Sequence, residues 1–159
     1  GASSSGAMPF DPDEAGLAAA TAHLNDWLPR RAMMVQPFLR RVQTEGEFSA
    51  IAVSGWITHG VQKIPKSGDF RVQDDHGASD QPWTPDEAAV AVIDRVLDAA
   101  AELVGSVTYA RVDVLRDETG RYLLTELELI EPSLFFRHGP EAPGVLADAV
   151  LSEAGASRR

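Results

Sequence analysis

The sequence predicts an α+β fold in which helices pack on one side of a largely antiparallel sheet. Three observations support this class: two pairs of strand-like segments are joined by short turns, helix-like segments carry capping residues, and the two kinds of segment alternate. The chain has 159 residues, the length of one ordinary domain. One folded unit is therefore expected.

The expected elements are, in chain order, a helix over 15–28, an edge strand over 33–39, hairpin strands over 48–53 and 56–64, a long polar loop over 65–82, a helix over 85–104, hairpin strands over 107–115 and 122–130, and a helix over 142–154.

Capping and breaking residues define the helices. Asp11-Pro12-Asp13-Glu14 places acidic groups in the first turn of the first helix, and Pro29 ends it. Thr84 and Pro85 are typical of the N-cap and the first helical position, and Gly105 is typical of a C-terminal end. Between these signals, apolar residues recur at helical spacing, which predicts one buried face for the second helix.

Turn residues define the strands. Ser54-Gly55 forms a compact turn between two apolar segments, and Asp117-Glu118-Thr119-Gly120 does the same for the second pair, so each pair predicts a hairpin. Pro37 interrupts the segment 33–39, which indicates an edge strand or a strand leading to a hinge. A loop as long as 65–82 is typical of a functional or mobile segment.

Composition excludes several classes of function. The formal net charge is −10 and the pI is about 4.7, which argues against a non-specific nucleic-acid binder. The sequence has no cysteine, so disulfides, thiolate nucleophiles and cysteine zinc sites are excluded. No apolar run approaches the ~18 residues of a membrane span, and no secretory leader is visible. A cytoplasmic protein without a membrane partner is expected.

The second hairpin carries the most informative charges. If its loop is centred on residues 118–119, Arg111 lies opposite Glu126, Asp113 opposite Leu124, and Tyr109 opposite Glu128. Because cross-strand partners share a face, one face then carries four charged side chains. They are Arg111, Asp113, Glu126 and Glu128. The other face is a core face, made of Ala110, Val112, Val114, Leu123, Thr125, Leu127 and Leu129.

Two interpretations of this charged face stay open. Carboxylates that lie close together raise one another's pKa values, and hard oxygen ligands of this kind suit Mg²⁺. Arg111 beside them is suited to phosphoryl oxygens. The alternative is a half-exposed hairpin whose charges are simply solvated, with one cross-strand ion pair that contributes little. A register slip of one residue also separates the cluster.

Several stretches together resemble the C-terminal half of an ATP-grasp domain, as found in glutathione-synthetase-like ligases and the relatives of the cyclase that makes D-cycloserine. The first stretch, Gly1-Ala2-Ser3-Ser4-Ser5-Gly6, is similar to a glycine-rich phosphate loop, and the second, Val35-Gln36-Pro37-Phe38, is similar to the adenine-binding hinge. The third, Lys63-Ile64-Pro65-Lys66-Ser67-Gly68-Asp69-Phe70-Arg71, is similar to an R-I-P-x-x-G-D-F-R stretch. The last, Ala110-Arg111-Val112-Asp113 with Thr125-Glu126-Leu127-Glu128, is similar to the terminal Mg²⁺-binding signature. The resemblance spans residues 1 to about 136, and it implies an ATP-grasp portion over 1–156.

The resemblance implies a role for each matching residue. Asp113, Glu126 and Glu128 would hold Mg²⁺ on the phosphates of ATP, and Arg111 and Arg71 would steady the transferring phosphoryl group. The nucleotide would also contact a further set of residues, namely Ser4, Ser5 and Gly6 in the lid, Gln36 and Phe38 in the hinge, Lys63, and Glu47 at the ribose, where Glu45 competes. The implied partners are a small-molecule carboxylate and an amine, joined through an acyl phosphate.

Two departures from the family pattern keep alternatives open. Glu128 stands where many members have Asn, and the family's first nucleotide-binding lysines would lie before residue 1. The opening Gly1–Ala7 is thus either an expression scar or a phosphate loop separated from its lysine strand. The chain is then a ligase fragment that is inactive or feeble alone, a binding module with nucleotide or Mg²⁺ affinity, or a structural module. A truncated hinge would expose apolar surface and favour a homodimer.

Overall fold

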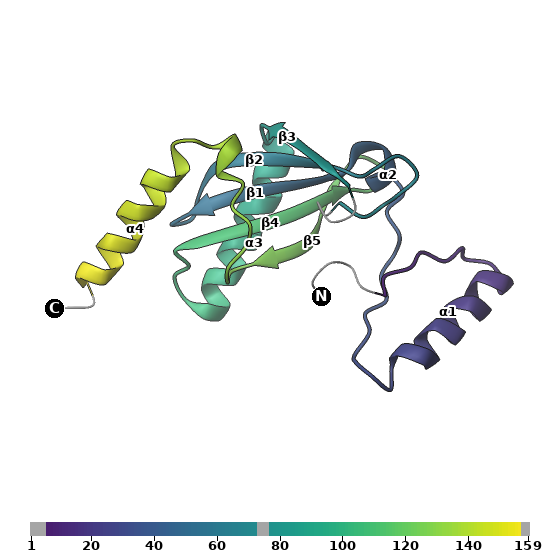
Figure 1. Ribbon diagram of the computed structural model, residues 1–159. Coiled ribbons are helices and arrows are strands. Elements are labelled where there is room, and N and C mark those ends of the chain that lie inside the picture. The colour runs from purple at the N-terminus through teal and green to yellow at the C-terminus, as the bar shows by residue number, and fades with distance from the viewer. Residues whose placement is uncertain (1–5, 73–76, 157–159) are drawn as a thin grey trace. The chain divides into compact units, whose positions relative to one another are not determined.

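The computed structural model describes residues 6–72 and 77–156, and the chain divides into two compact units (Figure 1). The units are Gly1–Phe38 and Leu39–Arg159. Within residues 6–72 and 77–156, no helix combines the length and apolar character that crossing a membrane requires.

The first unit is built around one helix, α1 (Glu14–Trp27). The Asp13 side chain caps it by accepting a hydrogen bond from the Gly16 N–H at 2.7 Å, which confirms the predicted helix start. The edge strand predicted over 33–39 is wrong, because these residues have no regular secondary structure. Pro37 cannot donate to a strand ladder, and the segment pairs with no strand in the described residues.

The second unit holds a five-stranded antiparallel sheet in the order β3-β2-β1-β4-β5. Its strands are β1 (Glu47–Val53), β2 (Trp56–Ile64), β3 (Ser79–Trp83), β4 (Tyr109–Arg116) and β5 (Tyr122–Glu128). Both predicted hairpins and the α+β class are confirmed. The loop predicted over 65–82 is wrong at its end, where β3 pairs with β2 through an irregular sequence that contains Pro82. An edge strand tolerates such a proline.

The helices of the second unit are α2 (Val42–Glu45), α3 (Glu87–Val104) and α4 (Ala142–Ala156), with a 3₁₀ turn, η3 (Phe136–His138), before α4. The N-cap of α3 is Asp86 rather than the predicted Thr84, since the Asp86 carboxylate accepts from the Ala89 N–H at 2.8 Å. The short α2 and η3 carry no amphipathic period, and the sequence does not predict them.

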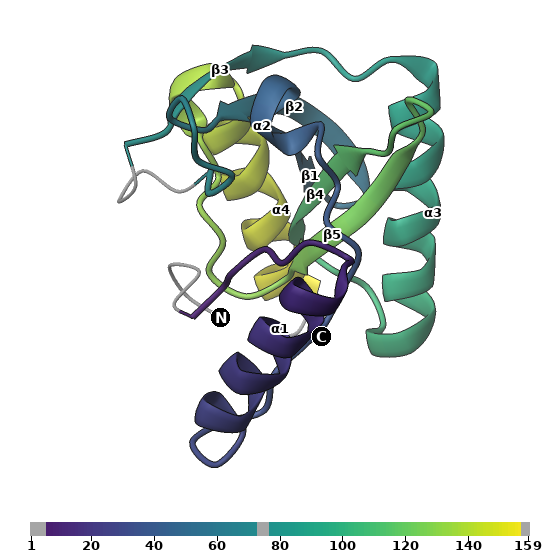
Figure 2. The same cartoon turned by 90° about the vertical axis from the view of Figure 1, so that its right-hand side faces the viewer.

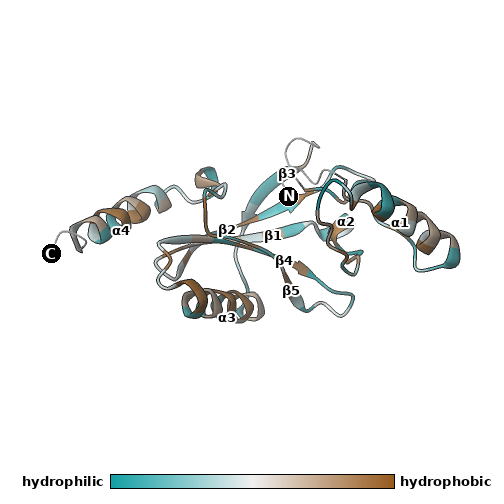
Figure 3. Ribbon diagram, turned by 90° about the horizontal axis from the view of Figure 1, so that it is seen from below, coloured by the Kyte–Doolittle hydropathy of each residue, from teal (hydrophilic) through white to brown (hydrophobic). Residues whose placement is uncertain are grey.

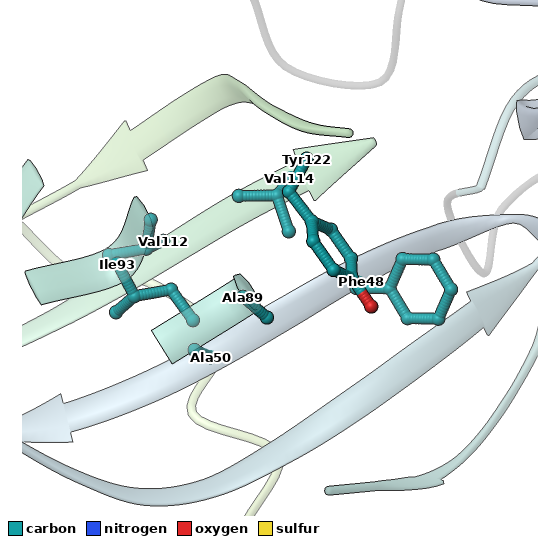
Figure 4. Close-up of a cluster of buried hydrophobic side chains, with 7 residues drawn as sticks. All are labelled: Phe48, Ala50, Ala89, Ile93, Val112, Val114 and Tyr122. Atoms are coloured by element: carbon teal, nitrogen blue, oxygen red, sulfur yellow. The ribbon is translucent and has the colours of Figure 1, made fainter. Parts of the chain in front are cut away.

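The main core lies between the sheet and α3, which covers one face (Figures 2 and 3). It consists of Phe48, Ala50, Ala89, Ile93, Val112, Val114 and Tyr122 (Figure 4). The residues between them along β1 and β4 point to the opposite face. There Ile51 and Val61 pack with Phe135, just before η3, in a smaller cluster. The sheet therefore has an apolar α3 face and a second face, here called the site face, that is only partly covered by apolar groups.

Candidate functional site

The hairpin of β4 and β5 brings four charged side chains to the site face. Arg111 pairs with Glu128 and Asp113 pairs with Glu126 across the two strands. Cross-strand partners share a face, so the four groups that the sequence analysis placed together do lie together. Neither the Asp113 carboxylate (0% exposed) nor the Arg111 side chain (9% exposed) is a solvated surface group.

The predicted register sets Arg111 opposite Glu126 and Asp113 opposite Leu124. The observed pairing of these two residues with β5 differs from it by two residues. One residue of the shift arises at the turn, and the other at a β-bulge where Thr125 has no cross-strand partner. The Thr125 hydroxyl donates to the backbone carbonyl of Asp113 at 3.0 Å. Because side chains alternate faces at each residue, a shift of two returns the charged groups to one face.

The same shift changes the predicted core face of β5. Leu123, which is predicted to lie in the core, is 39% exposed, and Tyr122 takes the buried position. The cause lies in the turn, where the Asp117 carboxylate accepts from the backbone N–H groups of Thr119 and Arg121 at 2.9 Å each. This arrangement widens the turn and moves every later pair by one residue.

Asp113 is the centre of the charge cluster. The Arg111 Nε atom donates to Oδ1 of Asp113 at 3.0 Å, and its Nη2 donates to Oδ2 at 2.9 Å. The Lys63 Nζ atom reaches Oδ2 from β2 at 3.2 Å. A fully buried carboxylate is costly unless cations and hydrogen-bond donors surround it, and these two side chains supply both.

Glu47 joins the cluster from the start of β1, opposite Lys63 in the register, and forms an ion pair with it. Burial raises the pKa of Glu47, with Lys63 opposing this shift and Asp113 adding to it. Burial lowers the pKa of Lys63, but Glu47 and Asp113 outweigh burial and the net shift is upward. Glu45, the competing candidate at the ribose, instead pairs with Arg41 at 2.8 Å.

Glu128 and Glu126 form the open side of the cluster. Arg111 Nη2 lies 2.9 Å from Glu128 and 3.6 Å from Glu126, whose side chain is 53% exposed. The pKa of Glu126 is raised by burial, then by Glu128 and Asp113. The most accessible carboxylate of the cluster is thus the one whose charge is least well compensated.

The cluster carries more negative than positive charge. Its four carboxylates (Glu47, Asp113, Glu126 and Glu128) and two cations (Lys63 and Arg111) give −4 + 2 = −2 when all are ionised. Within the described ranges, no three Asp, Glu or His side chains form a group ready to hold a metal ion. Mg²⁺ seldom needs such a cage, because it uses one or two carboxylates with waters and phosphate oxygens. The donor set and its excess charge therefore fit Mg²⁺ shared with a phosphate ligand.

Ser49 is a residue of the site face that the sequence analysis does not identify. It lies opposite Asp113 in the register and is 0% exposed, and its hydroxyl has no hydrogen-bond partner among residues 6–72 and 77–156. A buried hydroxyl without a partner is uncommon and asks for an explanation. The available signal is a serine inside an otherwise apolar strand.

Arg71, the second predicted guanidinium, does not join the cluster. Arg71 is held by Asp69 in the loop after β2, with Nη2 to Oδ2 at 2.7 Å, and no contact with Asp113 is present among residues 6–72 and 77–156. Gly6, Gln36 and Phe38 belong to the first unit. Ser4 and Ser5 lie outside the described residues. These nucleotide contacts stay predictions.

Comparison with known proteins identifies the fold. The chain resembles a D-cycloserine synthetase at 24% identity and a TM-score of 0.74, covering 86% of this chain and 48% of that one. It also resembles a D-alanine–D-alanine ligase from Bacillus anthracis complexed with ATP, at 13% identity and a TM-score of 0.55, covering 92% of this chain and 48% of that one. A D-alanine–D-alanine ligase from Coxiella burnetii is similar at 16% identity and a TM-score of 0.57, covering 95% of this chain and 43% of that one. By sequence, no family model and no curated protein matches.

The chain therefore has the fold of part of an ATP-grasp ligase, which confirms the resemblance at the level of the fold. It spans less than half the length of each of these three structures.

Proposed function

We propose that the site face is the Mg²⁺- and phosphate-binding part of an ATP-dependent carboxylate–amine ligase that works through an acyl phosphate. The observation that carries this proposal is the buried Asp113, held by Lys63 and Arg111 inside a cluster with an excess of two negative charges. The fold shared with ATP-grasp ligases supports the same assignment.

The proposed role of each carboxylate in the cluster follows from how exposed it is. Asp113 accepts hydrogen bonds from both Arg111 and Lys63, so its role is to fix these two side chains beside the accessible carboxylates. Glu126 and Glu128 are the accessible carboxylates and would hold Mg²⁺. When bound, Mg²⁺ neutralises charge on the ATP phosphates during phosphoryl transfer.

In the proposed reaction, a substrate carboxylate oxygen attacks the γ-phosphorus of ATP, the bond to the bridging oxygen breaks, and ADP leaves. An amine nitrogen then attacks the acyl carbon, the bond from that carbon to the phosphate oxygen breaks, and inorganic phosphate leaves with the proton that the amine gives up as the amide forms. Arg111, anchored by a two-point hydrogen bond to Asp113, donates to developing negative charge without reorganising. Arg71, on its loop, would provide a second guanidinium. A cytoplasmic location and a homodimer stay predictions.

A second candidate is a module that binds Mg²⁺-nucleotide without ligation. Lys63 and Arg111, both held by Asp113, can bind phosphate oxygens whether or not a ligation step follows. Both candidates need the same charge cluster, so nucleotide binding is the first quantity to measure.

The test compares two charge-neutralising pairs of substitutions. Calorimetric titration with Mg²⁺-ATP should give saturable binding, and ligand at 100 times Kd should stabilise the fold by about 2.7 kcal/mol. Asp113→Asn with Glu126→Gln should weaken binding at least tenfold. Asp98→Asn with Glu102→Gln removes the same charge from the exposed side of α3 and should leave Kd unchanged. Equal losses in both variants, or no binding by the unaltered chain, would refute the proposal.

A further inference from the structure

Residues 131–139 belong to the segment between β5 and α4, which crosses the site face toward β2 and β3 (Figure 1). We call residues 131–139 the strap. Phe135 of the strap is 9% exposed and packs on Ile51 of β1 and Val61 of β2. Val61 and Asp113 are the two cross-strand neighbours of Ser49, the buried serine without a partner. The strap therefore covers the site face directly beside the charge cluster.

The backbone of the strap is held in an unfavourable conformation. Phe135 has φ 47° and ψ 41°, and Glu131 has φ 48°, both in the left-handed region. An aromatic side chain rarely adopts this region, and such residues persist only where the surroundings over-determine them. Contacts on both sides of Phe135 must therefore fix the strap.

Asp80 of β3 provides the first of these contacts. Its Oδ1 atom lies 2.6 Å from Nε2 of His138, and its carboxylate forms an ion pair with Arg137. The Arg137 guanidinium in turn lies over the Phe135 ring, 5.1 Å from its centre. The side chains of Asp80 and His138 are only 12% and 13% exposed, so their contact is desolvated, whereas the Arg137 side chain is 52% exposed and its ion pair is half open to solvent.

His59 of β2 provides the second contact. Its Nε2 atom lies 2.9 Å from the backbone carbonyl of Leu134, and its Nδ1 lies 3.0 Å from the Thr58 hydroxyl. Gly139 closes against the same ring, since a Cβ there would come within 2.3 Å of Nδ1. The strap is thus fixed at both ends of Phe135, by a backbone hydrogen bond before it and by Asp80 after it.

We infer that Asp80 is a positioning residue, which acts through Arg137 and His138 to seat Phe135 on β1 and β2 and to keep water from the buried end of the charge cluster. Asp80 is the register partner of Lys63, and Lys63 is the partner of Glu47, so the anchor and the cluster share one row across the sheet. Excluding water strengthens the electrostatic interactions at Lys63 and Asp113. The consequence of this water exclusion for ligand binding rests on the proposed function.

The experiment measures two quantities on the full chain. Hydrogen exchange reports the seating of the strap through the amides of His138 and Gly139, which donate to the carbonyls of Phe135 and Phe136. Calorimetry reports the Kd for Mg²⁺-ATP. In Asp80→Asn, these two amides should exchange at least tenfold faster, the β1 amides should be unchanged, and Kd should rise three- to tenfold.

Further variants separate positioning from a general loss of stability. Asp80→Glu keeps the carboxylate and should restore most of the affinity. In an Arg137→Gln, His138→Gln background, Asp80→Asn should have no further effect on Kd. Asp26→Asn, which breaks an exposed ion pair with Arg30, is the matched control and should change neither quantity.

The outcomes distinguish this inference from the proposed function. Unchanged strap exchange in Asp80→Asn overturns the anchor. Faster exchange with an unchanged Kd overturns the positioning role. If the unaltered chain binds no Mg²⁺-ATP, the proposed function fails, and the exchange rates alone decide whether Asp80 seats the strap.

Discussion

The two faces of the same sheet bury opposite kinds of side chain, apolar on the α3 face and largely polar or charged on the site face. On the α3 face, the inward side chains along the middle of β1 and β4 are apolar and pack on Ala89 and Ile93, and Arg116 at the end of β4 lies over the Phe48 and Tyr122 rings. On the site face, the intervening positions of the same strands carry Ser49, Arg111 and Asp113, all at least nine-tenths buried. Strand alternation allows both within a few residues of each other.

The difference separates the source of stability from the source of chemistry. Burying apolar groups stabilises a fold, whereas burying charged pairs contributes little net stability and is often worse than an apolar replacement. The site face also leaves Glu126 poorly compensated and the Ser49 hydroxyl without a partner. Such costs are typical of a functional site held by a core elsewhere.

The largest expected effect tests the α3 face. Ile93→Ala removes a fully buried side chain from the centre of the core and should lower the free energy of unfolding by about 2–5 kcal/mol. Chemical denaturation measures this loss. Leu103→Ala on the same helix is the control, because Leu103 is 84% exposed and its loss should cost less than about 0.5 kcal/mol. Comparable losses would contradict the assignment of the core.

The next effect tests the site face. Asp113→Asn leaves Arg111 and Lys63 buried with one fewer partner, but Glu128 and Glu47 still pair with them. The expected loss is therefore about 1–3 kcal/mol, smaller than for a charge left wholly unpaired. Denaturation of the variant beside Asp94→Asn, an exposed control on α3, measures it. A gain in stability would mean that the carboxylate is strained rather than held.

The sequence predicts the fold well where local signals agree. Both hairpins and α3 follow from turn residues, capping residues and helical spacing. β3 is missed because its pairing with β2 is long-range and its own residues, among them Pro82, are poor strand formers. The prediction of a strand over 33–39 is wrong for the opposite reason. Its apolar residues favour a strand locally, but no other strand of the described residues pairs with them.

The charged face is predicted from the sequence only in part. Arg111, Asp113, Glu126 and Glu128 are found by alternation, although their pairs are not, because a bulge at Thr125 has no recognisable signal. Contacts between distant segments lie beyond such reasoning. No spacing connects Asp80 to His138, or an orphan hydroxyl to Asp113, until the strands are placed.

The smallest expected effect concerns the open side of the cluster and has the opposite sign. The pKa of Glu126 in the folded chain lies above its ordinary value of 4.5, owing to burial and then to Glu128 and Asp113. The folded state therefore binds a proton more readily than the unfolded state. As pH rises from 4.5 through the folded pKa, this carboxylate lowers the free energy of unfolding.

Glu126→Gln removes that penalty, so the variant should be more stable than the unaltered chain at pH 8, by on the order of a few tenths of a kcal/mol because half of the side chain is exposed and screened. The advantage should vanish below pH 4, where the carboxyl is protonated in both states. Denaturation at the two pH values measures this, with Glu102→Gln at an exposed position of α3 as the control. A variant that is less stable at pH 8 would show that the ion pair of Glu126 with Arg111 outweighs the repulsion from Glu128 and Asp113. The charges of the site face would then cost less stability, relative to the α3 face, than their number implies.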